Sequence, residues 1–215
     1  MGVIDIRMIR RPMVAAAAFL AALTGGVGSA AAQATSLNLD PAQTSVNFTL
    51  ADVLHTVHGT FHLNHGELQF DPLSGKISGE IVVDARSGES GSGMRDRKMR
   101  KEVLETERYP DISFRPDRVE GRVAKSGKSS VHVHGIFRIH GTDRELTVPA
   151  DVEMLGDHWS AAVHFIVPYA KWGMKNPSTL FLRVSDSVEI DVTGSGTAVP
   201  ANAAVSISGQ SAPSQ

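Results

Sequence analysis

The chain has 215 residues, of which 41% are hydrophobic, and a formal net charge of −2. This length allows one medium domain or two small ones, and the near balance of charges gives no general attraction to nucleic acid or to an anionic membrane. Cysteine is absent, which excludes disulfides, thiolate metal sites and a cysteine nucleophile.

The first 34 residues have the features of a secretory signal peptide. Arg7, Arg10 and Arg11 precede an apolar run at Met13–Leu23, and small residues follow. A positive segment, a short apolar segment and a small-residue cleavage site are the three parts of such a peptide, whereas a membrane-spanning helix needs about 20 apolar residues. We therefore expect residues 1–34 to be removed. The remaining chain, with 18 basic and 22 acidic residues, is expected in the periplasm or outside the cell, without stable insertion into a membrane.

Most of the remaining chain alternates between apolar and polar residues in short runs. In Ser45–Leu50 and in Val53–Leu63 every second side chain lies on a mainly apolar face. A period of two predicts antiparallel strands with one buried face and one solvated face. Further runs are predicted at Glu67–Phe70, Ile77–Ala85, Ile112–Phe114, Val119–Val123, Val131–His140, Leu146–Met154, Trp159–Val167, Leu180–Leu182 and Val188–Val192.

Three segments depart from this alternation. Arg86–Gly93 is rich in Ser and Gly and is predicted to be a loop. Met94–Leu104 places Met99, Val103 and Leu104 on one helical face, which predicts a short helix docked on an apolar surface. Residues 199–215 are small and polar with little apolar bulk, so we predict a disordered low-complexity tail.

The strand pattern predicts the fold class. Eight or nine short strands separated by turns indicate an all-β protein, and a closed barrel is favoured because closure removes exposed strand edges. We therefore predict an antiparallel eight-stranded β-barrel with a short helical insert, spanning residues 35–198. The interior of such a barrel is either filled by its own side chains or holds one small ligand, and the pattern leaves both open.

The in-facing apolar residues are the candidate lining of this interior. Gly59, Gly79 and Gly135 fall at in-facing positions, where small residues would leave gaps for a bound chain. His55 interrupts an apolar face, and is interpreted either as a core histidine with a polar partner or as a contact for a ligand head group. The predicted ligand-binding residues are Val46, Phe48, Leu50, His55, Val57, Phe61, Ile81, Val83, Phe114, Phe137, Ile139, Val148, Val163, Phe165 and Trp172.

Nine histidines raise the alternative of a metal-dependent enzyme. His132 and His134 share one face of a predicted strand, about 6.6 Å apart, as zinc ligands on strands do. They share that face with Ile136, Arg138 and His140 and point outward, without an obvious third ligand. A Gly-x-Ser-x-Gly nucleophile motif is absent from the sequence. We therefore predict no metal, no cofactor and no catalytic residues.

Several short motifs occur in a characteristic order. They are Leu39–Phe48, His58–Phe61, Phe70–Pro72, Val82–Ser87, Arg95–Arg100, Tyr109–Phe114 and Gly135–Thr142. Together they resemble the bacterial YceI-like, polyisoprenoid-binding family over about Leu37 to Thr197. The resemblance implies a lipocalin-like antiparallel barrel with an elongated apolar cavity that accepts an isoprenoid chain.

The expected function is that of an exported, non-enzymatic binding protein. Its expected partner is an isoprenoid-like lipid, such as a polyprenol derivative or a quinone, held for transport, storage or sequestration. One alternative is a ligand-free barrel that acts in protein interactions or stress responses. A second is a metal-dependent enzyme that uses His132 and His134. The sequence also leaves a homodimer open.

Overall fold

The computed structural model describes residues 34–51, 56–178 and 183–200. The elements in chain order are β1 (Thr35–Leu39), η1 (Pro41–Gln43), β2 (Ser45–Ala51), β3 (Thr56–Phe70), β4 (Ile77–Glu89), α1 (Gly93–Lys98), η2 (Met99–Val103), β5 (Asp111–Glu120), β6 (Gly127–Ile139), β7 (Thr142–Leu155), β8 (His158–Val167) and β9 (Val188–Pro200). Here η1 is a single 3-10 turn and η2 is a π-helical continuation of α1. The predicted signal peptide, apart from Ala34, and positions 201–215 of the predicted tail lie outside the described residues.

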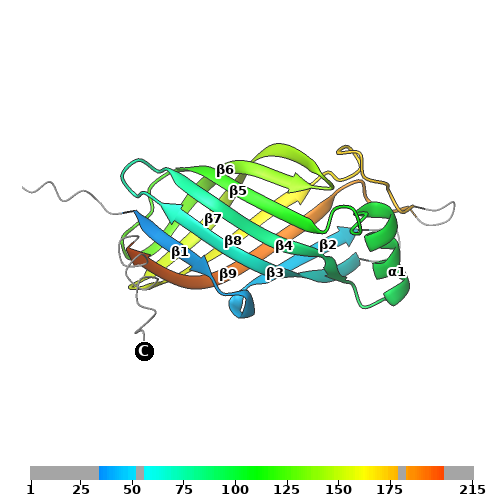
Figure 1. The fold of residues 1–215 in the computed structure, drawn as a ribbon, viewed down its shortest axis with the longest axis horizontal. Coiled ribbons are helices and arrows are strands. Elements are labelled where there is room, and N and C mark those ends of the chain that lie inside the picture. The colour runs from blue at the N-terminus through cyan, green and yellow to red at the C-terminus, as the bar shows by residue number, and fades with distance from the viewer. Residues whose placement is uncertain (1–33, 52–55, 179–182, 201–215) are drawn as a thin grey trace, which may run out of the picture. The chain divides into compact units, whose positions relative to one another are not determined.

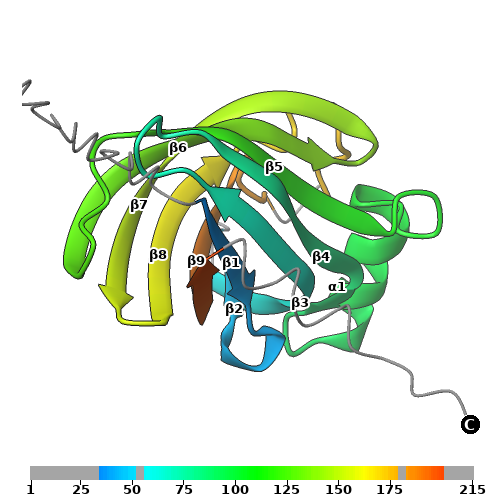
Figure 2. The same cartoon turned by 60° about the vertical axis from the view of Figure 1, so that its left-hand side comes forward.

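The strands close into one antiparallel barrel (Figures 1 and 2). Sequential strands from β3 to β9 pair with their neighbours, and β2 pairs with both β3 and β9. The strand β1 also pairs with both β3 and β9. The strands β1 and β2 therefore share one position of the barrel, between β3 and β9. The nine strands thus form an eight-stranded barrel with one short helix, as predicted.

The break between β1 and β2 has a local cause. Pro41 lies two residues after the end of β1, and proline has no N–H to donate to a strand neighbour. The carboxylate of Asp40 accepts a hydrogen bond from the backbone N–H of Ala42 at 2.9 Å, which caps the turn. The chain therefore leaves the sheet for one turn and re-enters it at Ser45. The strand β1 was not among the predicted runs.

Two predicted pairs of runs are single strands with bulges. The strand β3 runs unbroken from Thr56 to Phe70, with a register shift between Leu63 and His65. Asn64 and His65 are consecutive and both exposed, so the alternation of faces shifts by one residue there. Leu63 and Leu68 therefore both face inward, although one has an odd number and the other an even number. The strand β5 likewise continues through a shift near Pro116 and joins the two runs predicted there.

The strands β4 and β9 are longer than predicted. The prediction of a loop at Arg86–Gly93 is wrong for its first part, because β4 continues to Glu89, which pairs with Thr60. The hydroxyl of Ser87 holds this irregular stretch, since it accepts the backbone N–H of His62 at 2.8 Å. The strand β9 continues to Pro200, two residues beyond the predicted domain boundary, because its last residues pair with β1. The predicted run Leu180–Leu182 lies outside the described residues.

The predicted helix is present and covers one end of the barrel (Figure 1). Met99, Val103 and Leu104 pack against an apolar cluster that contains Phe137, Ile139 and Val167. A second cluster, around Leu37, Leu68 and Trp159, lies near the other end of the strands. Within the described ranges, no helix has the length and hydrophobicity needed to cross a membrane.

Candidate ligand cavity

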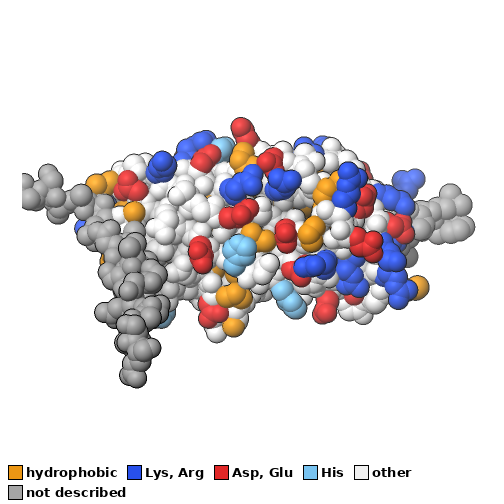
Figure 3. Space-filling view, in the orientation of Figure 1, with side chains coloured by type: hydrophobic (Ala, Val, Ile, Leu, Met, Phe, Trp, Pro, Cys, Tyr) orange, Lys and Arg blue, Asp and Glu red, His pale blue; other side chains and the backbone are white. Residues whose placement is uncertain are grey.

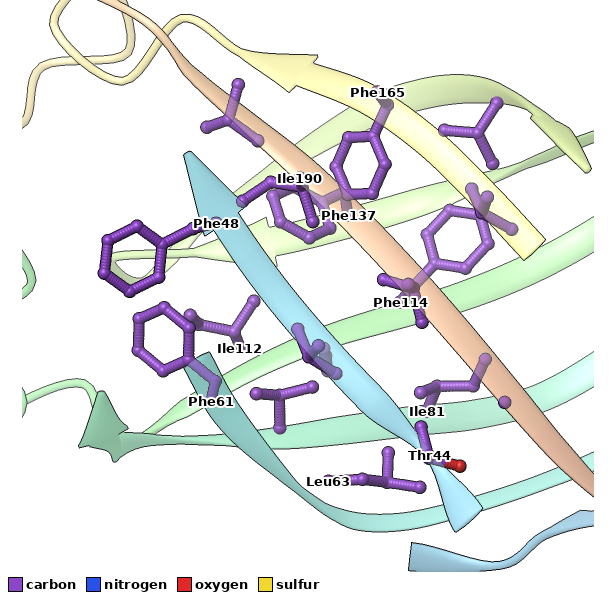
Figure 4. A pocket seen from close by; sticks show the side chains of 18 of the residues that line it. Thr44, Phe48, Phe61, Leu63, Ile81, Ile112, Phe114, Phe137, Phe165 and Ile190 are labelled. Carbon is purple, nitrogen blue, oxygen red and sulfur yellow. The ribbon is translucent and has the colours of Figure 1, made fainter. Parts of the chain in front are cut away.

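The barrel encloses a cavity of about 1250 Å³. All nine strands contribute apolar side chains to its wall, and ten of the lining residues are labelled in Figure 4. Its lining extends from Thr35 and Pro200 at one rim to the residues of α1 and η2 at the other. The volume exceeds the roughly 300–1,000 Å³ of ordinary small-molecule pockets. The cavity is therefore an elongated chamber that follows the barrel.

The side chains in the middle of the barrel leave part of their surface free. Val133, Val163 and Val192 point inward and line the cavity, but each is only half-buried. Other lining residues are tightly packed, such as Val148 and Trp159, which are 5% and 7% exposed. The free space therefore continues through the centre of the barrel.

A chamber of this volume is too costly to be left empty. At about 24 cal/mol per Å³, a void of 1250 Å³ would cost roughly 30 kcal/mol. A whole domain is stable by only about 5–15 kcal/mol. The chamber must therefore contain solvent or a ligand, and its largely apolar wall offers water few hydrogen-bond partners.

Aromatic pairs shape the wall near the helical end. The ring centroids of Phe48 and Phe61 are 5.4 Å apart, and those of Phe137 and Phe165 are 5.8 Å apart in an edge-to-face arrangement. These distances and tilts are typical of favourable aromatic contacts. The rings come from four different strands and project into the same space (Figure 4).

The structure brings together most of the predicted ligand-binding residues. Thirteen of the fifteen line the chamber: Val46, Phe48, Leu50, Val57, Phe61, Ile81, Val83, Phe114, Phe137, Ile139, Val148, Val163 and Phe165. Trp172 does not line it. The ring of Trp172 packs against Phe137, with centroids 6.0 Å apart, and the guanidinium of Arg144 lies 5.0 Å from the Trp172 ring. His55 lies outside the described residues.

The prediction that three glycines leave gaps in the chamber is wrong. None of Gly59, Gly79 and Gly135 lines the cavity. A Cβ at Gly59 would overlap the ring of Phe48, and one at Gly135 would overlap the backbone of Arg115. Gly79 has a φ of 117°, which other residues rarely adopt. These glycines permit close approach of neighbouring groups in the barrel wall and contribute no space to the chamber.

Charged residues at the helical end were missed as cavity residues. The side chains of Arg95, Arg97, Lys98, Lys101 and Glu102 line the chamber where it meets α1 and η2. The prediction for this segment used only the helical spacing of its apolar residues and did not consider its charged residues. The signal that could have revealed them is the dense basic run that the same residues form in the sequence.

Several contacts hold this end together. Lys98 Nζ donates a hydrogen bond to the carbonyl of Pro177 at 2.9 Å, and Lys175 Nζ donates to the Glu102 carboxylate at 2.6 Å. The hydrogen bond and the positive charge of Lys175 lower the pKa of Glu102. The helix is thereby fastened to the connection between β8 and β9.

A buried tyrosine also lines the chamber near this end. The hydroxyl of Tyr169, a residue that is 5% exposed, donates a hydrogen bond to the carbonyl of Ser185 at 2.5 Å. Burial, followed by the negative charge of Asp186, raises the pKa of Tyr169 to about 12. Its side chain is therefore a neutral phenol that adds no charge to the chamber at ordinary pH.

The paired histidines lie on the outer face of β6, as predicted. His132 is exposed, and His134 Nδ1 lies 2.8 Å from Asp117 Oδ1 and 3.0 Å from Arg118 Nη1. Over the ranges that the structure covers, no three His, Asp or Glu side chains are grouped closely enough to hold a metal ion. The pair is thus separated from the chamber by the barrel wall.

Fold and cavity together define a closed antiparallel barrel around an apolar chamber, the class of barrels whose interior can hold a ligand. The model of the YceI-like domain matches residues 37–195 of the chain. The chain therefore belongs to the YceI-like domain family, and the resemblance drawn from its motifs is confirmed. No curated protein sequence matches the chain.

Several solved structures share this fold. BcnA from Burkholderia cenocepacia is 18% identical, with a TM-score of 0.61, and the match covers 74% of this chain and 99% of BcnA. A polyisoprenoid binding domain from Saccharophagus degradans, described as implicated in plant cell wall breakdown, is 15% identical, with a TM-score of 0.59 and coverage of 78% and 99%. A YceI protein from Campylobacter jejuni is 14% identical, with a TM-score of 0.55 and coverage of 67% and 86%. At these identities the likeness shows the fold alone.

Proposed function

We propose that this protein binds an isoprenoid-like lipid, such as a polyprenol derivative or a quinone, inside the barrel. The observation that carries the proposal is the elongated chamber of about 1250 Å³ with its half-buried apolar wall. The similar domain from Saccharophagus degradans is described as polyisoprenoid binding, which supports the same ligand class here. The protein would transport, store or sequester the lipid without chemical change.

Burial of a lipid chain in this chamber is sufficient for tight binding. Each buried CH₂ group contributes about 0.8 kcal/mol, and a long chain presents many such groups. A lipid would also cover the free surface of Val133, Val163 and Val192 in the middle of the barrel. The binding energy therefore requires no charged contact within the central part of the chamber.

The same observation argues against a ligand-free solid barrel. In a solid barrel the in-facing valines of the central strands would be fully buried by one another, as protein interiors are close-packed. The alternative of a metal-dependent enzyme has no comparable support, because His132 and His134 lie on the opposite side of the wall from the chamber. Non-enzymatic binding therefore remains the proposal that the geometry supports best.

The proposal includes export to the periplasm or the exterior of the cell. It rests on the basic residues, the apolar run and the small residues within positions 1–34. N-terminal sequencing of protein recovered from an exported fraction should begin near residues 33–35. A sequence that begins at Met1 in that fraction would contradict the removal of a signal peptide.

The test of lipid binding is extraction of the purified protein followed by mass spectrometry. We expect an isoprenoid-like lipid in near-stoichiometric amount, and we expect protein stripped of it to take up a C20 prenol. Stripped, folded protein that binds neither the extracted lipid nor the prenol would overturn the proposal.

A further inference from the structure

The helical end of the barrel concentrates positive charge. The segment Gly93–Val103, which forms α1 and η2, contains five Arg or Lys side chains and two acidic ones, in a chain of formal net charge −2. Figure 3 shows Lys and Arg side chains gathered over α1, with acidic side chains between them. We call this segment the basic cap.

Both acidic side chains of the basic cap are already engaged. Asp96 is 7% exposed and accepts the backbone N–H of Ser90 at 2.9 Å. Glu102 is paired with Lys175, which brings a further positive charge to this end. Arg97 and Lys101 are exposed, and they form no ion pair with any residue of the described part of the chain. The charge that the cap presents to solvent is therefore cationic.

An apolar side chain stands among these cations. Met94 is 81% exposed, which is unusual for so large an apolar residue, and it also lines the opening of the chamber. Exposed apolar groups beside Lys and Arg are characteristic of segments that lie in the interface of an anionic membrane. Met99 and Val103 of the same segment also line the chamber, and they pack against the apolar cluster inside the barrel.

We propose that the basic cap docks onto an anionic lipid surface, and that lipid passes there between the surface and the chamber. The first part stands on charge and exposure alone, whereas the second part rests on the proposed lipid-binding function. The chain that remains after residues 1–34 has 18 basic and 22 acidic residues, and this small excess of negative charge does not prevent docking. Charges elsewhere on the barrel are screened over about 8–10 Å at physiological salt, so the nearest charges decide the interaction.

The opposite end of the barrel provides a matched control. Lys125 and Lys128 are exposed like Arg97 and Lys101, and Lys125 also lines the chamber at its own rim. Replacing either pair by glutamine removes two positive charges from the chain. The two double variants therefore differ in where the charge is lost and not in how much is lost.

The experiment measures how much protein sediments with lipid vesicles. One set of vesicles contains phosphatidylcholine alone, and the other contains about a third of phosphatidylglycerol in addition. The protein is used in the form that remains after processing by its host. We expect binding to the anionic vesicles that weakens as salt is raised. Each cation near an anionic surface contributes about fivefold to partitioning. Arg97→Gln with Lys101→Gln should thus lower partitioning by about 30-fold, whereas Lys125→Gln with Lys128→Gln should change it by less than about threefold. Equal losses in both double variants, or no binding of the parent to anionic vesicles, would overturn the docking proposal.

A second measurement separates docking from lipid binding. We expect Arg97→Gln with Lys101→Gln to slow the transfer of a fluorescent prenyl lipid from anionic vesicles by at least tenfold, and to change its transfer from vesicles of phosphatidylcholine alone by less than about threefold. Unchanged transfer in a variant that no longer docks would show that lipid enters elsewhere. Docking without any lipid uptake by the parent would refute the proposed function and leave the docking surface intact.

Discussion

Two neighbouring rungs of one strand ladder offer a direct test of the chamber. Val163 of β8 lies opposite Val192 of β9, and both side chains line the chamber. On the next rung Ala162 lies opposite Thr193, and both are exposed on the outer face. Replacing each pair by two asparagines puts the same polar groups inside the barrel or outside it. Effects of asparagine on strand stability are then shared by the two double variants.

The expected magnitude follows from desolvation. In the ligand-free barrel the amides at positions 163 and 192 face a solvent-filled chamber, because Val163 and Val192 are only half-buried. A bound lipid would remove that water without supplying a hydrogen-bond partner, at a cost of about 1–3 kcal/mol for each amide. The inner double variant should thus lose about 2–6 kcal/mol of binding free energy, which is at least about a 30-fold weaker affinity.

Thermal unfolding with and without a C20 prenol measures this difference. A ligand present at 100 times its Kd stabilises the folded state by about 2.7 kcal/mol, which should raise the Tm of a domain of this size by roughly 5–11 °C. We expect this rise in the parent and in the outer double variant, and at most about a third of it in the inner one. An inner double variant that folds and keeps both the full rise in Tm and its co-purified lipid would refute the assignment of the chamber as the binding site.

Three further predictions concern stability, pH and the histidines. The pKa of Tyr169 rises from 10.0 to about 12 on folding, so the folded state holds the proton more tightly between these values. The free energy of unfolding should therefore fall by up to about 2.7 kcal/mol as pH rises from 10 to 12, and Tyr169→Phe should lack this fall in pH-dependent denaturation. Gly135→Ala should cost about 1–3 kcal/mol in chemical denaturation, because its Cβ would lie 2.6 Å from Pro116 Cα. His132→Ala with His134→Ala should leave lipid co-purification unchanged, since both lie outside the chamber.

Each of these predictions has a control or an outcome that contradicts it. A Tyr169→Phe protein with the same loss of stability between pH 10 and 12 would assign that loss to other groups. Gly93→Ala is the control for Gly135→Ala, because nothing lies within 4 Å of a Cβ at Gly93. If both variants are equally stable, the close approach at Gly135 does not constrain the barrel. Loss of lipid on removing the two histidines would move the binding site to the outer face.

The lining of the chamber was predictable because it depends on a local pattern. Alternation along a strand assigns each side chain to one of two faces, and thirteen of the fifteen candidates selected in this way line the cavity. The pattern cannot distinguish one bulged strand from two strands. Leu63 and Leu68 differ in parity, which is compatible with a turn or with the bulge at Asn64 and His65 that the structure contains.

The remaining errors concern positions whose environment is set by distant segments. The space at Gly59 is taken by Phe48, and that at Gly135 by the backbone of β5, which no inspection of the glycines' own strands could show. Trp172 lies in a connection without strand periodicity, so its face could not be assigned from the sequence. The basic cap was visible in the sequence, but its position beside the chamber depends on the docking of α1 and η2 on the barrel end.

The width of the chamber is a property of the closed sheet and not of unusually small residues. Val133, Val163 and Val192 are ordinary strand residues, and between two sheets packed about 10 Å apart the same side chains would interdigitate and be fully buried. Around eight strand positions they face one another across a wider interior, and part of each side chain stays uncovered. The closure depends on the pairing of β1 and β2 with β9, since these ladders join the first strands of the chain to its last strand. One set of residues can therefore give a filled core or a chamber. The pairing of β1 and β2 with β9, whose paired residues are at least 140 positions apart (Thr49 with Glu189), decides which of the two forms, and the alternation within any one strand does not.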